Sequence, residues 1–128
     1  MKELVCVFIG GGLGSVVRYM VSMIWRHLSL NPRYADIVFP WPTFVVNILG
    51  CLLIGIFYEY SERWGMTPEM RIFLTTGLCG GFTTFSTFSY ESMTLMHTGH
   101  LSLCALYVIG SILLGVIAVF LPQIISHL

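Results

Sequence analysis

The chain has 128 residues and a formal net charge of zero at pH 7; 56% of its residues are hydrophobic and only 9% are charged. Soluble domains usually carry about 25% charged residues, so the composition predicts an integral membrane protein. The balanced charge provides no basic surface for nucleic acid and no acidic tail.

Four apolar stretches account for most of the chain: residues 4–25, 42–60, 72–96 and 101–125. Each is close to or above the roughly 20 residues that a transmembrane helix needs. The first is too long for a cleaved signal peptide, and no small-x-small cleavage site follows it. We therefore predict an all-α integral membrane protein with one four-helix transmembrane domain over residues 1–128. Four helices enclose almost no interior, so we expect a transport path to lie between subunits of a homo-oligomer, most simply a dimer.

The first stretch contains small residues at helical spacing and one arginine. Gly10 and Gly14 share a face, as do Gly11 and Ser15, which is typical of helices that pack closely in membranes. Arg18 lies among apolar residues about one and a half turns before Trp25. It either snorkels or forms a structural pair, or it provides a positive field for an entering anion.

The second stretch has one strongly polar side chain, Asn47, about 8 Å inside the helix at an α-helical rise. Thr43, Asn47 and Cys51 follow one another at i, i+4 spacing and so share a face. The amide either joins two helices by hydrogen bonds or directs an N–H group at an anion. The four cysteines, one in each stretch, have no metal or disulfide spacing, and we interpret them as small buried hydrophobes.

The loop before the third stretch predicts a helix start. Pro68 suits the first helical position, with Thr67 as its N-cap and Glu69 in the first turn.

The third stretch contains T-T-G-L-C-G-G-F-T-T-F-S-T-F-S at residues 75–89. Gly77, Gly80 and Gly81 each weaken a helix by roughly 1 kcal/mol relative to alanine, and β-branched threonines follow them. Within a membrane, non-helical backbone is tolerated only where protein or a wet cavity surrounds it. We predict a helix broken near the middle of the bilayer, with carbonyls and hydroxyls facing an ion or a polar path.

After the glycines of this motif, Phe82, Phe85 and Phe88 recur every three residues. Such a stripe usually packs, but here it alternates with hydroxyls, and the positive edges of phenylalanine rings can face an anion. Glu91 lies in apolar surroundings, so it should be paired or face water, for example by pairing with an arginine of a neighbouring subunit.

A short loop, residues 97–100, makes the third and fourth stretches antiparallel. Tyr107 and Ser111 share a face of the fourth stretch, with Gly115 one turn further. The two hydroxyls either extend a hydrogen-bonding track or satisfy neighbouring groups.

The positive charges give no decisive orientation. The termini and the second loop hold three basic residues, and the other two loops hold two; these are Lys2, Arg63 and Arg71 against Arg26 and Arg33. This balance favours a chain that inserts in both orientations and forms an antiparallel dimer.

The sequence resembles the Fluc, or CrcB, family of fluoride channels. The resemblance rests on G-L-C-G-G-F-T-T-F-S-T-F-S in the third stretch, with G-G-G-L-G-S-V-V-R-Y in the first and T-F-V-V-N-I-L-G in the second. It covers essentially the whole chain. It implies a dual-topology, antiparallel homodimer in the cell membrane that exports cytoplasmic fluoride passively through two pores.

The resemblance also implies roles for individual residues. The residues that it places along the fluoride pore are Asn47, Phe85, Phe88, Ser86, Thr87, Glu91, Tyr107 and Ser111. The main-chain carbonyls of Gly80 and Thr83, from both subunits, correspond to those that hold a structural sodium ion at the dimer centre. Arg18 matches the family's first-span arginine. Gly115 stands where the family has a further hydroxyl, so this sequence lacks the last group of the polar track.

Other function classes fit less well. No nucleophile–base pair, carboxylate dyad or phosphate loop is present, so the sequence offers no catalytic residues and predicts a non-enzyme. A small multidrug-type proton-coupled exporter is also a short four-span dimer, but it needs an acidic residue in the first span, where only Arg18 is charged. A purely structural subunit would explain the glycines, but not Asn47 and the clustered hydroxyls together.

Overall fold

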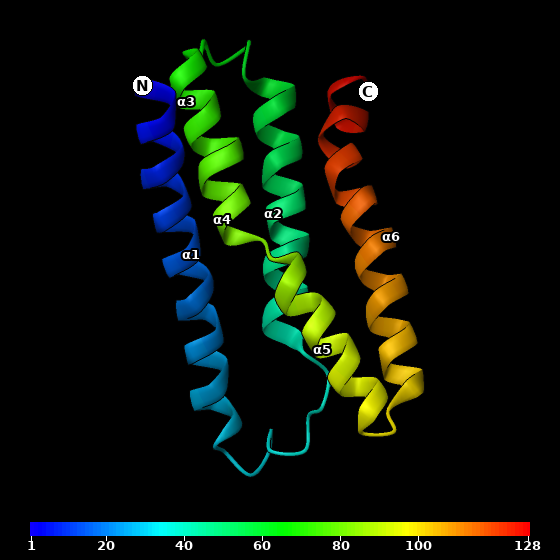
Figure 1. The fold of residues 1–128 in the computed structure, drawn as a ribbon. Coiled ribbons are helices and arrows are strands. Elements are labelled where there is room, and N and C mark those ends of the chain that lie inside the picture. Colours follow the sequence, from blue (N-terminus) through cyan, green and yellow to red (C-terminus); the bar gives the residue numbers. More distant parts are fainter.

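The computed structural model describes residues 1–128, and all of its regular elements are helices (Figure 1). The helices α1 (Lys2–Ser29), α2 (Trp41–Tyr60) and α6 (Leu101–Ser126) are each long and apolar enough to cross a membrane. Between α2 and α6 the chain forms α3 (Pro68–Ile72), the π-helical η1 (Phe73–Cys79), α4 (Gly80–Phe82) and α5 (Phe85–His97). The predicted all-α, multi-pass membrane fold is therefore confirmed.

Two helix ends can be compared directly with the sequence predictions. The side chain of Thr67 accepts a hydrogen bond from Met70 N at 3.2 Å, so the predicted N-cap of α3 is confirmed. The first helix continues to Ser29, one turn beyond the predicted end at Trp25. Arg26 lies in this additional turn, where a positive charge stabilises the carboxyl end of a helix.

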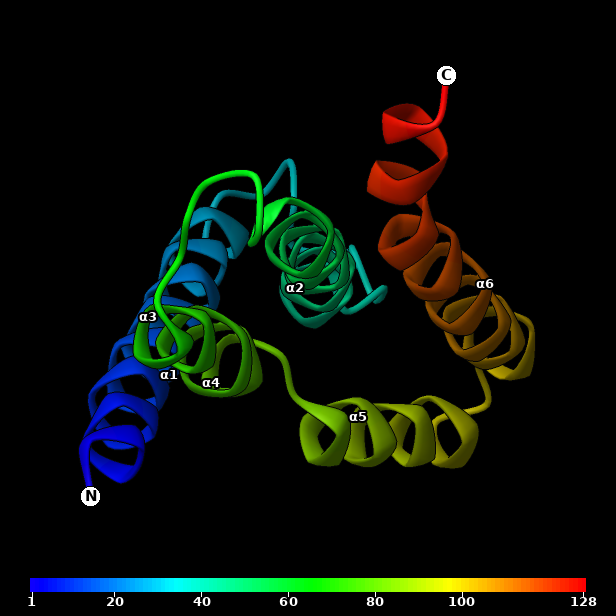
Figure 2. The ribbon, with the colours of Figure 1, turned by 90° about the horizontal axis from the view of Figure 1, so that it is seen from above.

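The helices are arranged around α2. Seen from above, α2 lies between α1 with α3 and α4 on one side and α6 on the other (Figure 2). The segment α3–η1–α4 packs along α1, whereas α5 crosses to α6. Both termini lie at the same end of the molecule (Figure 1).

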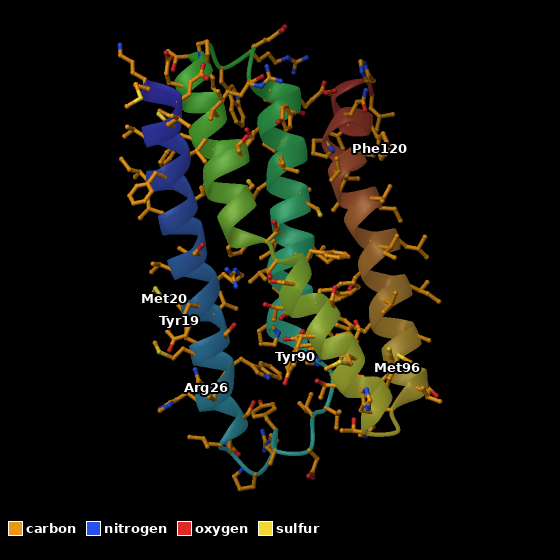
Figure 3. All side chains as sticks on the ribbon, in the orientation of Figure 1. Tyr19, Met20, Arg26, Tyr90, Met96 and Phe120 are labelled. Atoms are coloured by element: carbon orange, nitrogen blue, oxygen red, sulfur yellow. The ribbon has the colours of Figure 1, made fainter.

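Most side chains point outward, and only 16 of the 128 residues are buried. Large apolar side chains cover the outside of the helices, among them Tyr19, Met20 and Phe120 (Figure 3). Such a surface would aggregate in water, but in a bilayer lipid chains solvate it. The fold therefore depends on close helix contacts rather than on a large sequestered core.

The closest of these contacts is made by glycines. A Cβ at Gly10 would lie 2.6 Å from the carbonyl oxygen of Phe73 and 3.0 Å from Cα of Gly77, both of them backbone atoms. A Cβ at Gly14 would meet the backbone of Leu78 and Phe82 in the same way. The predicted packing role of the small residues of the first stretch is confirmed, and their partner is the third stretch of the same chain.

The third stretch leaves helical geometry at Thr83 and Thr84, and not at its glycines. Gly80 has φ −62° and ψ −38°, an ordinary helical conformation. Thr83 (φ −83°, ψ 158°) and Thr84 (φ −150°, ψ 120°) are extended. Of the two causes that the sequence suggested, the β-branched threonines agree with the structure and the glycines do not. Gly77 and Gly81 pack against α1, and this contact outweighs their low helix propensity.

The interruption ends where a new helix is capped. The side chain of Thr84 accepts a hydrogen bond from Thr87 N at 3.3 Å, which makes Thr84 the N-cap of α5. Threonine is a favourable N-cap, and its extended backbone is compatible with that position.

The glycine contact predicts opposite effects for two neighbouring substitutions in α1. Gly10→Ala should lower the free energy of unfolding in detergent by about 1–3 kcal/mol, because the new methyl group overlaps backbone that cannot move aside. Gly12→Ala is the matched control: nothing lies within 4 Å of its Cβ, so this variant should be as stable as the native protein or slightly more stable. Thermal unfolding of the purified variants measures both, and equal stability of the two would contradict the packing assignment.

Candidate functional site

The interruption of the third stretch is held by Asn47 of α2. Its Nδ2 donates to the carbonyl oxygen of Thr84 at 3.1 Å, and its Oδ1 accepts from Thr84 N at 2.8 Å. Both backbone groups of Thr84 are thus satisfied by one amide, at a point where no helical partner exists. Of the two roles considered for Asn47, joining two elements is the one that these contacts provide. The second hydrogen on Nδ2 is free for another acceptor.

These bonds leave two carbonyl groups without their helical donors. The N–H of Thr84, four residues after Gly80, donates to Asn47. The N–H of Thr87, four residues after Thr83, donates to the Thr84 hydroxyl. The carbonyl groups of Gly80 and Thr83 are thereby released at the interruption.

The intervening carbonyl of Gly81 is bonded to the first helix. Arg18 Nε donates to it at 3.1 Å, and Ser15 Oγ lies 3.4 Å away as a second donor. Arg18 therefore forms a structural pair with the third stretch, one of the two roles that its position suggested. Arg18 thus reaches the interruption from α1.

A second polar cluster surrounds Glu91 of α5. Thr43 Oγ1 donates to its Oε1 and the Tyr107 hydroxyl donates to its Oε2, each at 2.8 Å. The carboxylate is thus satisfied within the subunit by two neutral donors. Tyr107 is fully buried, so its hydroxyl is fixed in place.

Aromatic rings connect this cluster to the interruption. The Phe88 ring lies 5.0 Å from that of Tyr107 and 5.8 Å from that of Phe85, measured between ring centroids. Phe88 is half-buried, but Phe85 is 79% exposed although it begins α5 beside the interruption. Of the two phenylalanines, only Phe88 is packed within the subunit.

A cavity of about 250 Å³, here called the inner cavity, opens where these elements meet. It brings together four of the residues predicted for the fluoride pore, Asn47, Phe85, Phe88 and Ser111, with Thr83 of the predicted sodium site. Its other lining residues are Cys51, Thr84 and Ile112. The Oγ atom of Ser111 is buried and has no hydrogen-bond partner. Because a buried hydroxyl without a partner is costly, this atom is available to a polar occupant of the cavity.

A second cavity, of about 330 Å³, lies beside Glu91 and is called the outer cavity. Its wall includes Thr98 and His100 from the loop between α5 and α6, and Pro40 directly before α2. Glu91 lines the outer cavity, and Phe88 lines the inner one and touches the ring of Tyr107. The Glu91 cluster thus lies between the two cavities.

The remaining predicted site residues, Ser86 and Thr87, lie in the first turn of α5 and do not line the inner cavity. Their hydroxyls approach Thr84 Oγ1 at 3.4 Å and 3.1 Å. The sequence interpretation did not assign site roles to Thr43, Thr84 and Ser15, whose side chains or backbone bond to the predicted residues. Only Thr43 had a usable signal, because it precedes Asn47 by four residues on the same face of α2.

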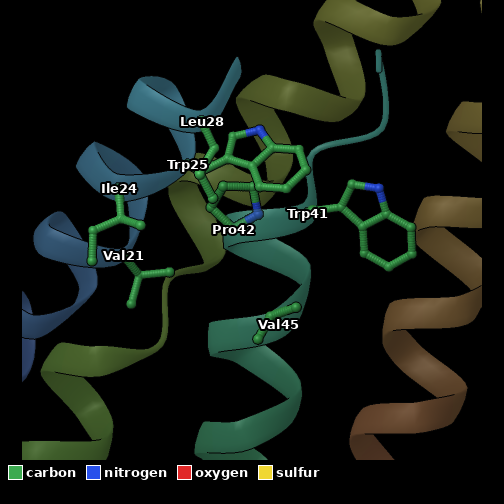
Figure 4. Close-up of a pocket in the computed structure, with 7 residues that line it drawn as sticks. All are labelled: Val21, Ile24, Trp25, Leu28, Trp41, Pro42 and Val45. Carbon is green, nitrogen blue, oxygen red and sulfur yellow. The ribbon is translucent and has the colours of Figure 1, made fainter. Parts of the chain in front are cut away.

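An apolar groove of about 320 Å³ lies apart from this site (Figure 4). It separates the end of α1 from the start of α2, and its lining includes Trp25, Trp41 and Pro42. It offers no carboxylate, amide or hydroxyl side chain, so it provides no group for ion chemistry.

The polar contacts predict that Asn47 and Ser111 differ in their effect on stability. Asn47→Ala leaves a backbone N–H and a C=O of Thr84 without partners, each at a cost of about 1–3 kcal/mol, so this variant should unfold at a clearly lower temperature. Ser111→Ala removes an unpartnered hydroxyl and should leave stability unchanged or raise it. Thermal unfolding in detergent measures the unfolding temperature of both variants. A similar decrease in both would show that the bonds between Asn47 and Thr84 do not contribute specifically to stability.

The chain was compared with known proteins. A family profile described as CrcB-like protein, camphor resistance (CrcB), matches residues 5–123. The similar proteins that carry the name fluoride-specific ion channel FluC include the following three. The protein of Bacteroides fragilis is 50% identical over 93% of this chain and 91% of its own length. That of Phocaeicola vulgatus is 49% identical over 94% and 95%, and that of Flavobacterium psychrophilum is 42% identical over 98% of both. These matches, with a polar site built around an interrupted third span, show that the chain belongs to the CrcB family.

Proposed function

We propose that this protein is a fluoride-selective passive channel that exports cytoplasmic fluoride across the cell membrane. The observation that carries the proposal is the inner cavity, where the unpartnered Ser111 hydroxyl lies beside the Asn47 amide and the rings of Phe85 and Phe88. Relatives that are about half identical to this chain are named as fluoride-specific ion channels, which supports the same function.

The chemistry of the cavity suits a small, strongly hydrated anion. To enter, such an ion must exchange water for close donors, and an amide, a hydroxyl and aromatic ring edges can provide them. A fixed cation in the path would bind fluoride too tightly for rapid release. The lining of the inner cavity includes no arginine, lysine or carboxylate, and Arg18 bonds to the carbonyl of Gly81 instead.

The path that we propose starts in the outer cavity, passes the hydroxyls of Thr43 and Tyr107 beside Glu91, and continues past Phe88 to the inner cavity. Ser86 and Thr87, in the first turn of α5, border the same path with their hydroxyl groups. The interruption at Thr83 and Thr84 would then lie near the middle of the bilayer, at the narrowest part of the path.

A second copy of the chain completes the path. Phe85 is 79% exposed beside the inner cavity, and a single subunit of this size does not enclose a continuous pore. The near-equal number of basic residues on the two sides favours insertion in both orientations. We therefore propose an antiparallel homodimer with two pores, in which the partner covers Phe85.

The dimer centre would hold a structural sodium ion. The residues implied for this role, Gly80 and Thr83, are among those whose carbonyl groups lose their helical donors at the interruption. Carbonyl oxygens are hard ligands that suit a hard cation such as sodium, so the donor set fits the ion. Two such carbonyls from each subunit would supply four ligands, and the ion would fix the subunits to each other.

The alternative is a small multidrug-type proton-coupled exporter. It would need a protonatable acidic residue within the membrane part of the first helix, and residues 4–25 contain none. The available carboxylate, Glu91, is held by two hydroxyl donors on α2 and α6. We therefore favour the channel.

Anion efflux from liposomes tests the channel and its site together. Purified protein in vesicles loaded with fluoride or chloride should release fluoride rapidly and chloride negligibly, as read by ion-selective electrodes. Ser111→Ala removes one donor to an anion, worth about 1.5–3 kcal/mol, and should slow fluoride release about 10- to 100-fold without loss of stability. Phe85→Ile and Asn47→Asp should abolish it.

Three results would count against parts of this proposal. Equal release of fluoride and chloride would support a pore but contradict its selectivity for fluoride. No release of either anion, with uptake of cationic dyes under a proton gradient, would favour the exporter. Full activity of Ser111→Ala would remove the inner cavity from the path.

Removal of sodium tests the structural ion. Protein purified and reconstituted with a large organic cation in place of sodium should lose fluoride efflux, because released carbonyls would be left unsatisfied at the dimer centre. Sodium should restore the efflux and potassium should not, since ligand distances fix the size of the site. Full activity without sodium, or equal rescue by potassium, would contradict the site.

A further inference from the structure

One face of α2 carries three polar groups in successive turns, and two of them bond to the third stretch. Thr43 bonds to Glu91, and Asn47 bonds to Thr84. The third is Cys51, four residues after Asn47, which is a free cysteine. It lines the inner cavity together with Asn47 and Ser111.

The opposite wall of the cavity, on α6, has a matching gap. Ser111 provides a hydroxyl there, and Gly115, one turn further, provides no side chain. A Cβ on Gly115 would lie 3.4 Å from Sγ of Cys51. The thiol of Cys51 therefore occupies the space that a side chain at position 115 would enter.

We propose that the thiol of Cys51 lines the fluoride path as the next group beyond Ser111. The inference rests on the proposed channel function and adds a residue to its path. A thiol is a weak S–H donor without a fixed charge, which suits a wall that must release an anion. Along α6 the polar side chains of the path are Tyr107 and Ser111. Beyond Ser111, the next polar group on the path is Cys51 of α2.

The position of Cys51 predicts a block by a small thiol reagent. With methyl methanethiosulfonate, the Cys51 sulfur attacks the sulfenyl sulfur, a disulfide to a methylthio group forms, methanesulfinate leaves and the thiol proton passes to the buffer. The added group occupies the inner cavity, so fluoride efflux should fall at least about tenfold relative to the untreated sample, as expected of an apolar obstruction in a narrow pore. Mass spectrometry of the peptides identifies which cysteine has reacted.

Two variants separate Cys51 from the other cysteines. In Cys51→Ala the reagent should no longer reduce efflux, compared with the untreated rate of the same variant. Cys6→Ser is the matched control: Cys6 is half-exposed on α1 and lies outside both cavities, so this variant should conduct and be blocked like the native protein.

A second experiment moves the donor from α2 to α6. Cys51→Ala alone should slow fluoride efflux because it removes the S–H group. Adding Gly115→Ser should restore much of the lost rate, because the new hydroxyl starts from a Cβ next to the former sulfur position. A purely structural role of Cys51 would not predict this rescue.

Several results would overturn the inference. They are modification of Cys51 with undiminished efflux, a block that persists in Cys51→Ala, no reaction of Cys51 in the conducting protein, and failure of Gly115→Ser to raise the rate of Cys51→Ala. No efflux from the untreated native protein would overturn the channel function itself, and with it the role of Cys51 in conduction.

Discussion

The structure depends on satisfying the backbone groups that leave helical geometry at Thr83 and Thr84. Inside a bilayer no water is available to them, and each group without a partner costs several kcal/mol. The Asn47 amide serves the N–H and the C=O of Thr84, and Arg18 serves the carbonyl of Gly81. The Asn47 bonds join the interruption to α2, and the Arg18 bond joins it to α1. Both helices must therefore be in place for the third span to adopt this shape. The inner cavity lies where this arrangement separates α5 from α4.

Small residues make these bonds possible. Gly10 and Gly14 allow the backbone of α1 to touch that of η1 and α4, and only at this distance does Arg18 reach the carbonyl of Gly81. In a membrane, where helices gain little from hydrophobic burial against one another, such close packing is a main source of association. The glycines of the third stretch therefore position the interruption, although they do not form it.

The sequence was sufficient to predict the family, the helical spans, the Thr67 cap and the close packing of the first-span glycines. It predicted an interruption of the third stretch and named both the glycines and the β-branched threonines as its causes. Only the threonines are extended, because helix propensity describes an isolated helix and not one whose glycines pack against another backbone. The partners of Arg18 and Glu91 could not be predicted, since each lies on an element far away in the chain. Asn47 had two plausible roles, and only its distance to Thr84 shows that it joins α2 to the interruption. The unpartnered state of Ser111 has no sequence signal at all.

The interruption also bears on how the chain enters the membrane during synthesis. The 13 residues of α5 extend about 20 Å at an α-helical rise, short of the roughly 30 Å hydrocarbon core. Without the other spans, this segment would expose the N–H groups of its first turn to lipid without hydrogen-bond acceptors. The first two spans emerge from the ribosome earlier and already contain Asn47 and Arg18. The order of the spans along the chain thus supplies the partners of the third span before it is made, so that its unpaired backbone need never be exposed to lipid.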